Sequence, residues 1–215
     1  MEMVETETNI VVLNEQPEFS ASSEEEVSAN YFILCEENAE TALSKNVYDF
    51  KIAGMSILNW VVRACETQPV ILKVSEGDDV LSAIKPHIGG AEYSVVLYAN
   101  TPLVNKGHLK DLLCYVSRKR MNACKLKKGY VFKNEYISHV DEIYSIDTHD
   151  FASNDFYEVK NYDDLSYVQD ILSKKVINYH KKNGVYFDNP NFVTIDATTD
   201  IGYASTIASG LTGGL

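Results

Sequence analysis

A short apolar run, followed by a turn and an amphipathic segment, constrains this sequence more than any other feature. Val95–Tyr98 has no charged or amide side chain and is rich in β-branched and aromatic residues, which predicts a strand buried on both faces. Apolar residues in Lys106–Val116 then recur at helical spacing. Because ligands of open α/β sheets bind beyond the carboxyl ends of the strands, Asn100 and Thr101 are candidate ligand-binding residues. The alternative is that Asn-Thr-Pro only forms a turn before the helix.

Strands and helices alternate along the rest of the chain. The other expected strands are Tyr31–Leu34, Val70–Val74, and one or two short strands between Cys124 and Phe132. The other expected helices are Ile52–Cys65, Asp78–Ile84 and Asp163–Tyr179. This alternation predicts an α/β fold with a doubly wound, mostly parallel sheet of the Rossmann type over residues 29–184.

The negative charge is concentrated at the amino-terminal end. The net charge is −12, and the first 44 residues contain eleven Asp or Glu residues and no Lys or Arg. We expect residues 1–28 to form a flexible acidic arm. Its apolar patch Ile10–Leu13 belongs either to a solvated tail, which we favour, or to a strand added at a sheet edge. Because no basic excess exists to replace counterions, nucleic-acid binding is not expected.

The composition is typical of a globular cytoplasmic protein. Hydrophobic residues make up 45% of the chain, but no apolar run approaches the roughly 18 residues of a membrane span, and the acidic start is unlike a signal peptide. We therefore expect neither membrane insertion nor export. The four cysteines lack zinc-ligand spacing, so no metal site is expected; Cys35 and Cys114 lie in apolar surroundings and are expected to be buried.

Two charged clusters each have a functional and a structural interpretation. The basic cluster is a phosphate site or, as we favour, a solvated helix end: it contains Arg118–Arg120, Lys125, Lys127 and Lys128. The acidic cluster is a metal site or, as we favour, a solvated loop: it contains Asp141, Glu142, Asp147, His149 and Asp150.

The carboxyl-terminal segment has a six-residue period. Ile195, Ile201 and Ile207 are separated by small and polar residues, which predicts a short left-handed parallel β-helix stub over residues 185–215. About three rungs fit before the end of the sequence, close to the minimum for a stable repeat. The stub is therefore expected to pack on the preceding domain or on copies of itself.

Four motifs together resemble one known family. Ile52–Val61 resembles a helix start "(V/I)-A-G-K-P-M-L-x-x-V", Val96–Val104 a strand and turn "V-L-Y-G-D-x-P-L", and Gly129–Phe132 a strand "G-(I/L)-Y-(V/A)-F". His180–Val185 and Val193–Gly202 resemble a linker helix and the first β-helix rungs. These are motifs of the bifunctional bacterial N-acetylglucosamine-1-phosphate uridyltransferase and glucosamine-1-phosphate acetyltransferase. The resemblance implies a nucleotidyltransferase-like domain followed by a β-helix.

The sequence departs from that family at several positions that bind the nucleotide. Leu34–Leu43 stands in place of a phosphate-binding loop but has no glycine or arginine and contains three glutamates. Tyr48 and Asp49 occupy the place of a catalytic lysine. The first magnesium-binding aspartate corresponds to Asn100, a weaker ligand for a hard dication. The second metal-binding position falls at Lys160 or Asn161.

These losses predict a catalytically inactive relative with a structural or partner-binding role, as a subunit of a larger particle such as a phage or viral assembly. The degenerate substrate pocket then consists of Asn100, Thr101 and Asn161, with no catalytic residue, metal or cofactor. The alternative is an altered sugar-1-phosphate nucleotidyltransferase of the UDP-N-acetylglucosamine type, which would need Mg²⁺, or a sugar-nucleotide sensor. Protein partners or self-association, as a trimer, are expected through the arm and the stub.

Overall fold

A five-stranded sheet forms the centre of the protein. The computed structural model describes residues 27–37, 43, 46–141 and 155–208, so the expected acidic arm lies almost wholly outside the described residues. The strands have the spatial order β4–β1–β5–β7–β6. Their bounds are β1 Ala29–Glu37, β4 Val70–Ser75, β5 Tyr93–Tyr98, β6 Ala123–Leu126 and β7 Gly129–Lys133. β1 is parallel to β4 and β5, whereas β7 is antiparallel to β5 and β6, so the sheet is mostly parallel, as predicted.

β5 is the central strand, and all six of its residues are buried. It pairs with β1 on one side and with β7 on the other, so both rows of its backbone hydrogen-bonding groups have partners within the sheet. Ser28 extends this pairing, because its carbonyl accepts a hydrogen bond from the Tyr93 N–H at 3.1 Å. The apolar run that the sequence shows at Val95–Tyr98 is therefore required by burial on both faces.

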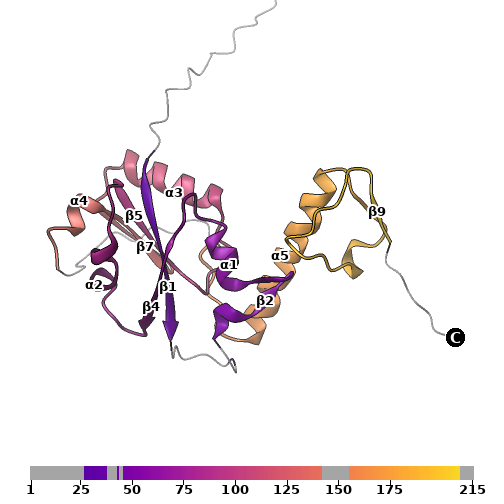
Figure 1. Cartoon of the computed structure of the whole chain (residues 1–215), viewed down its shortest axis with the longest axis horizontal. Coiled ribbons are helices and arrows are strands. Elements are labelled where there is room, and N and C mark those ends of the chain that lie inside the picture. The colour runs from indigo at the N-terminus through magenta and orange to yellow at the C-terminus, as the bar shows by residue number, and fades with distance from the viewer. Residues whose placement is uncertain (1–26, 38–42, 44–45, 142–154, 209–215) are drawn as a thin grey trace, which may run out of the picture.

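Helices cover both faces of the sheet, as expected of a doubly wound fold (Figure 1). On one face, odd-numbered residues of β1 pack against α1, α3 and α5; on the other, even-numbered residues pack against α2 and α4. The bounds of the helices are α1 Ile57–Val62, α2 Val80–Ile84, α3 Lys106–Arg118, α4 Asn134–Ile137 and α5 Tyr162–Lys182, with 3₁₀ turns at Val47–Asp49, Lys85–His87 and Pro190–Phe192. None of the described helices combines the length and apolar content that a membrane span requires.

The predicted helix over Ile52–Cys65 is wrong at both ends. β2 (Lys51–Ile52) and β3 (Met55–Ser56) form a short antiparallel hairpin, and α1 covers only Ile57–Val62. The apolar residues before Ile57 thus belong to a hairpin, although their spacing is compatible with a helix.

The backbone at the tip of this hairpin explains the difference. Ala53 and Gly54 have φ values of 47° and 76°, in the left-handed region that a right-handed helix cannot include. Ser56 then caps α1, because its side chain accepts a hydrogen bond from the Asn59 N–H at 3.2 Å. The helix therefore begins after the turn.

The hairpin also contacts the carboxyl-terminal segment. The Ala197 N–H donates a hydrogen bond to the Ala53 carbonyl at 2.8 Å. A Cβ atom on Gly54 would lie 1.6 Å from Asp196 Oδ2, so only glycine leaves room for this carboxylate. The hairpin tip and residues 196–197, which are far apart in the sequence, are thus in direct contact.

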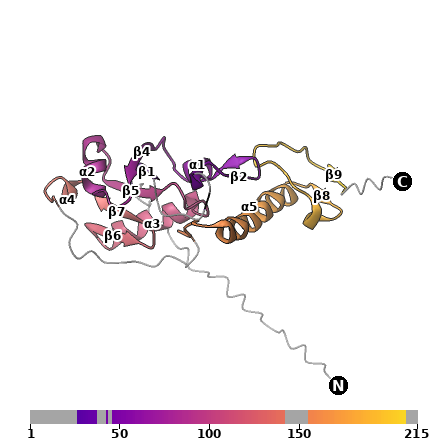
Figure 2. The ribbon, with the colours of Figure 1, turned by 90° about the horizontal axis from the view of Figure 1, so that it is seen from below.

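α5 leads away from the sheet toward the carboxyl-terminal segment (Figure 2), which has a small apolar cluster of its own. β8 (Tyr186–Phe187) and β9 (Thr206–Ile207) pair in parallel at its far end. The cluster is formed by Ile177, Val185 and Phe187, with Val193, Ile195, Ile201 and Ile207 packed against them. The three isoleucines of the six-residue period thus share one apolar environment.

None of the four cysteines forms a disulfide, and Cys35, Cys65 and Cys124 are buried. Cys114 is only half-buried, so the expectation that it is buried is wrong. The buried face of α3 consists of Leu109, Leu112, Leu113 and Val116, and Cys114 lies beside this face.

We expect Ile33→Ala in β1 to lower the free energy of unfolding by about 2–5 kcal/mol, because Ile33 is fully buried and the substitution leaves a cavity. Ile71→Ala is a matched control: Ile71 lies directly opposite in β4, but its side chain is 45% exposed. Its loss should stay below about 1 kcal/mol. Urea unfolding followed by circular dichroism measures both, and equal losses would contradict the position of β4 at the sheet edge.

Candidate functional site

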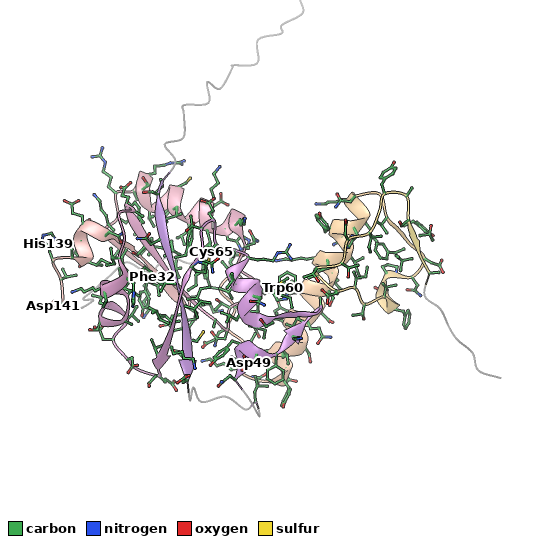
Figure 3. All side chains as sticks on the ribbon, in the orientation of Figure 1. Phe32, Asp49, Trp60, Cys65, His139 and Asp141 are labelled. Carbon is green, nitrogen blue, oxygen red and sulfur yellow. The ribbon has the colours of Figure 1, made fainter. Side chains whose placement is uncertain are left out.

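The carboxyl ends of the parallel strands meet at one end of the sheet, which we call the carboxyl edge. β1 ends here at Glu37, and the chain leaves β5 through Ala99 and Asn100. Because β7 is antiparallel to β5, the turn that precedes it, including Lys128, lies at the same edge. Asp49 is also found at this end of the sheet (Figure 3).

The ammonium group of Lys128 lies between two carboxylates. Its Nζ atom is 3.0 Å from Glu36 Oε2 and 3.0 Å from Glu158 Oε1. It also lies 4.1 Å from the centroid of the Tyr98 ring, a cation–π distance. Lys160 Nζ is 3.0 Å from the other oxygen of Glu158. We call Glu36, Tyr98, Lys128, Glu158 and Lys160 the Lys128 cluster.

Burial and hydrogen bonding shift the pKa values of Lys128 and Glu158 in opposite directions. Burial by itself lowers the pKa of Lys128, but hydrogen bonds with Glu158 and Glu36 outweigh it and raise the pKa above its ordinary value. Burial disfavours the charged form of Glu158, but hydrogen bonds from Lys128 and Lys160 hold its pKa below its ordinary value. Both groups are therefore charged at neutral pH, and each neutralises the other.

Asn100 is buried beside the Lys128 cluster. Its Nδ2 atom donates to Glu158 Oε1 at 3.2 Å and to the Val159 carbonyl at 3.5 Å. The Val159 N–H in turn donates to the Asn100 carbonyl at 2.9 Å. Asn100 Oδ1 is buried and has no hydrogen-bond partner in the part of the chain that the structure describes. The amide thus leaves one unused acceptor at the carboxyl edge.

The other two predicted pocket residues take part in local structure. The Thr101 hydroxyl is fully buried and donates to the Tyr98 carbonyl at 2.8 Å, which closes the turn after β5. Asn161 caps α5: its side chain accepts from the Asp164 N–H at 2.9 Å, and the Asp164 carboxylate accepts from the Asn161 N–H at 3.2 Å. Asn100 and Thr101 thus lie at the carboxyl edge, whereas the Asn161 side chain is engaged by α5.

A small cavity lies at the carboxyl edge among the described residues. Val47 and Tyr48 line a cavity of about 10 Å³ together with Leu34, Glu36, Ala99 and Asn100. That volume holds about one water molecule, whereas ligand pockets span roughly 300–1,000 Å³. The segment Leu34–Leu43, expected to be a loop, is a strand in its first part, because β1 continues through Glu37. Residues 38–42 lie outside the described residues.

Sequence reasoning missed the Lys128 cluster. It placed Lys128 in a solvated basic cluster, and this interpretation is wrong for that residue, which is ion-paired at the sheet edge. Glu158 was not singled out, although it lies two and three residues before the expected positions Lys160 and Asn161. Glu36 and Lys128 are 92 positions apart, so no local pattern connects them.

Within the described residues, no group of three or more His, Cys, Asp or Glu side chains is arranged to hold a metal ion. Of the acidic cluster, only Asp141 is described; its carboxylate lies 3.2 Å from Lys85 Nζ. The other four members fall outside the described residues. The carboxylates of Glu36 and Glu158 have lysine ammonium groups as their cations.

Comparison with solved structures identifies the fold. The chain is similar to CMP:2-keto-3-deoxy-manno-octonic acid synthetase complexed with CTP, with a TM-score of 0.52 and 9% identity over 69% of this chain and 99% of that chain. It is also similar to a homologue of Mycobacterium tuberculosis Rv0371c from Mycobacterium sp. strain JC1, with a TM-score of 0.52 and 9% identity over 68% of this chain and 98% of that one. The protein therefore has a nucleotidyltransferase-like fold. No protein-family model and no curated protein sequence matches this chain.

We expect Glu158→Gln to lower the free energy of unfolding at pH 7 by about 1.5–3 kcal/mol, because it removes charge-assisted hydrogen bonds and leaves Lys128 with Glu36 alone. The folded-state pKa of Glu158 is depressed, so its stabilisation is present above the unfolded value of 4.5 and is lost as the pH falls through the lower folded value. The difference between the two proteins should shrink below that pH. Urea titrations between pH 3 and pH 7 measure it.

Glu135→Gln is the matched control for this substitution. Glu135 pairs with Lys133 at 3.3 Å, but its side chain is 77% exposed. The expected loss is below about 1 kcal/mol. Similar losses in the two variants, at every pH, would show that the Lys128 cluster has no special energetic role.

Proposed function

We propose that this chain is a catalytically inactive nucleotidyltransferase-like protein, related to the bifunctional N-acetylglucosamine-1-phosphate uridyltransferase family, that acts by binding protein partners. The observation that carries the proposal is the position of Lys128 between Glu36 and Glu158. Nucleotidyl transfer depends on positioning the phosphates and neutralising their charge, usually with a magnesium ion held by carboxylates. Here the carboxylates of Glu36 and Glu158 are already neutralised by lysines of the chain itself.

The remaining features of the carboxyl edge support the same proposal. The first polar residue after β5 is Asn100, which brings no negative charge to a metal ion. Glu36 and Glu37 end β1, where they would repel the phosphates of a nucleotide. The cavity beside Asn100 is far too small for a nucleoside. Each of these features acts against binding of a magnesium–triphosphate complex.

One observation favours a second candidate function. Asn100 Oδ1 is a buried acceptor without a partner in the described chain, and such groups are costly unless a ligand or water donates to them. An altered sugar-1-phosphate nucleotidyltransferase, or a sensor that binds a sugar nucleotide without turnover, would use this acceptor. Either one requires the Lys128 cluster to open.

The partner-binding role is proposed for the carboxyl-terminal segment, which we interpret as the first coil of a β-helix. The parallel register of Phe187 with Ile207 is consistent with one coil, and the isoleucines of the six-residue period all pack inward. Four aromatic side chains of this region are largely exposed: Tyr179, Tyr186, Phe192 and Tyr203. Exposed aromatic groups at an open sheet edge favour association, here as a trimer within a larger assembly such as a phage or viral particle.

We expect no magnesium-dependent release of pyrophosphate from UTP and N-acetylglucosamine-1-phosphate, or from CTP and a sugar acid. The purified chain should also show no saturable Mn²⁺ binding by calorimetry, because the Lys128 ammonium occupies the space between the carboxylates. Lys128→Ala, with its fold checked by circular dichroism, removes that ammonium and should introduce Mn²⁺ binding. Turnover by the wild-type chain, or saturable Mn²⁺ binding by the wild-type chain that is equal to that of Lys128→Ala, would refute the proposed inactivity.

We expect Phe192→Ser combined with Tyr203→Ser to lower the mass measured by light scattering from that of an oligomer to that of a monomer. The two side chains are 79% and 86% exposed, so the substitutions should leave the fold intact. Ile71→Ser, at the exposed edge strand β4, is the control and should leave the mass unchanged. A wild-type chain that is monomeric at micromolar concentrations would exclude self-association through this region.

A further inference from the structure

Two adjoining cavities lie away from the carboxyl edge, on either side of Trp60 and Arg63 at the end of α1. The first has a volume of about 560 Å³ and reaches the start of α3; the second has about 380 Å³ and reaches α5 and residues 197–200. Both volumes are in the range of small-molecule sites. Trp60 faces α5, whereas Asp49 marks the carboxyl edge (Figure 3), and no residue lines both regions.

Three cations without carboxylate partners line these cavities. Arg63 lines both, Lys106 lines the first, and Lys175 lines the second. Among the described residues none of the three forms an ion pair, although Lys73, Lys85, Lys128, Lys133 and Lys160 all do. Asp200 is the single carboxylate among the described lining residues. In a chain with 31 acidic and 19 basic residues, this concentration of uncompensated positive charge favours an anionic ligand.

The start of α3 adds to the positive potential of the first cavity. Lys106 and Gly107 form the first turn of this 13-residue helix, and the N–H groups of a first turn have no partner within their helix. The helix dipole places partial positive charge at the same point. Arg63, Lys106 and these backbone groups thus surround one space that suits a phosphate.

The Trp60 ring supplies an apolar surface beside these cations. Its indole N–H donates to the Ile52 carbonyl at 3.1 Å, which fixes the ring orientation. The Arg63 guanidinium lies 5.7 Å from the ring centroid. An indole held in this way can stack against a flat ring of a ligand whose charged end meets Arg63.

The cavity is suited to binding rather than to covalent chemistry. Cys65 is the nucleophile that lines the first cavity, and burial raises the pKa of its thiol to about 12. The reactive thiolate is therefore scarce at neutral pH.

We propose that the cavities around Trp60 bind a phosphate ester that carries a planar ring, with its phosphate between Arg63 and Lys106 and its ring against Trp60. Lys175 extends the positive surface toward the second cavity. This proposal is independent of the function proposed for the carboxyl edge, because an inactive carboxyl edge leaves the Trp60 cavities unchanged.

The fluorescence of the chain tests this proposal directly, because Trp60 is its single tryptophan. Titration of the full chain with uridine monophosphate should change the emission saturably at micromolar to millimolar concentrations. Uridine and ribose 5-phosphate, which carry the ring or the phosphate alone, should each bind at least about tenfold more weakly. The dissociation constant should rise with ionic strength.

Substitutions locate the bound probe. Lys106→Gln should raise the dissociation constant about tenfold, and Arg63→Gln at least as much, by calorimetry as well as by fluorescence. Lys174→Gln is the matched control: Lys174 is adjacent to Lys175 on α5 but lines neither cavity, so binding should not change. The three side chains are exposed, so folding should persist. Failure of uridine monophosphate to bind at millimolar concentrations, or binding that is unaffected by both Lys106→Gln and Arg63→Gln, would overturn the proposal.

Discussion

The complete burial of β5 is the constraint on which the rest of the structure depends. A strand with apolar side chains on both faces needs a helix layer on each face, and its backbone needs a hydrogen-bonded strand on each side. β1 and β7 meet the second requirement, while α3 and α5 on one face and α2 and α4 on the other meet the first. The direction of β5 then decides where its polar continuation, Asn100, emerges.

The charged groups at the carboxyl edge are arranged unfavourably for a polyphosphate. A site that receives a polyphosphate must present positive charge or metal ions to it. This edge presents Glu36, Glu37 and Glu158, and the lysines beside them form ion pairs with these carboxylates. Its attraction for an external anion is therefore low. Arg63, Lys106 and Lys175, which form no ion pair among the described residues, lie instead around Trp60, away from the carboxyl edge.

The sequence was most informative where structure is determined locally. The unbroken apolar run before Asn100 predicted β5, and the helical spacing of apolar residues after Lys106 predicted α3. Both patterns are local, because each depends on which side chains of one segment are buried. The hairpin at residues 51–56 was missed, because its apolar residues also suit a helix and only the positive φ values at Ala53 and Gly54 distinguish the two structures. The role of Asn161 had a readable signal, since Asn161 and Asp164 have capping-box spacing. The Lys128 cluster had none, because its members meet only after the sheet has assembled.

The contact of Gly54 with Asp196 has a consequence for the order in which the protein matures on the ribosome. Translation proceeds from the amino terminus at about 5–20 residues per second, so the hairpin emerges many seconds before the segment that covers it. During that interval the Ala53 carbonyl, which later accepts from the Ala197 N–H, is accessible to water and to chaperones. Completion of the hairpin surface therefore waits for residues 196 and 197 to emerge, and a nascent chain that stalls before residue 196 leaves this surface uncovered.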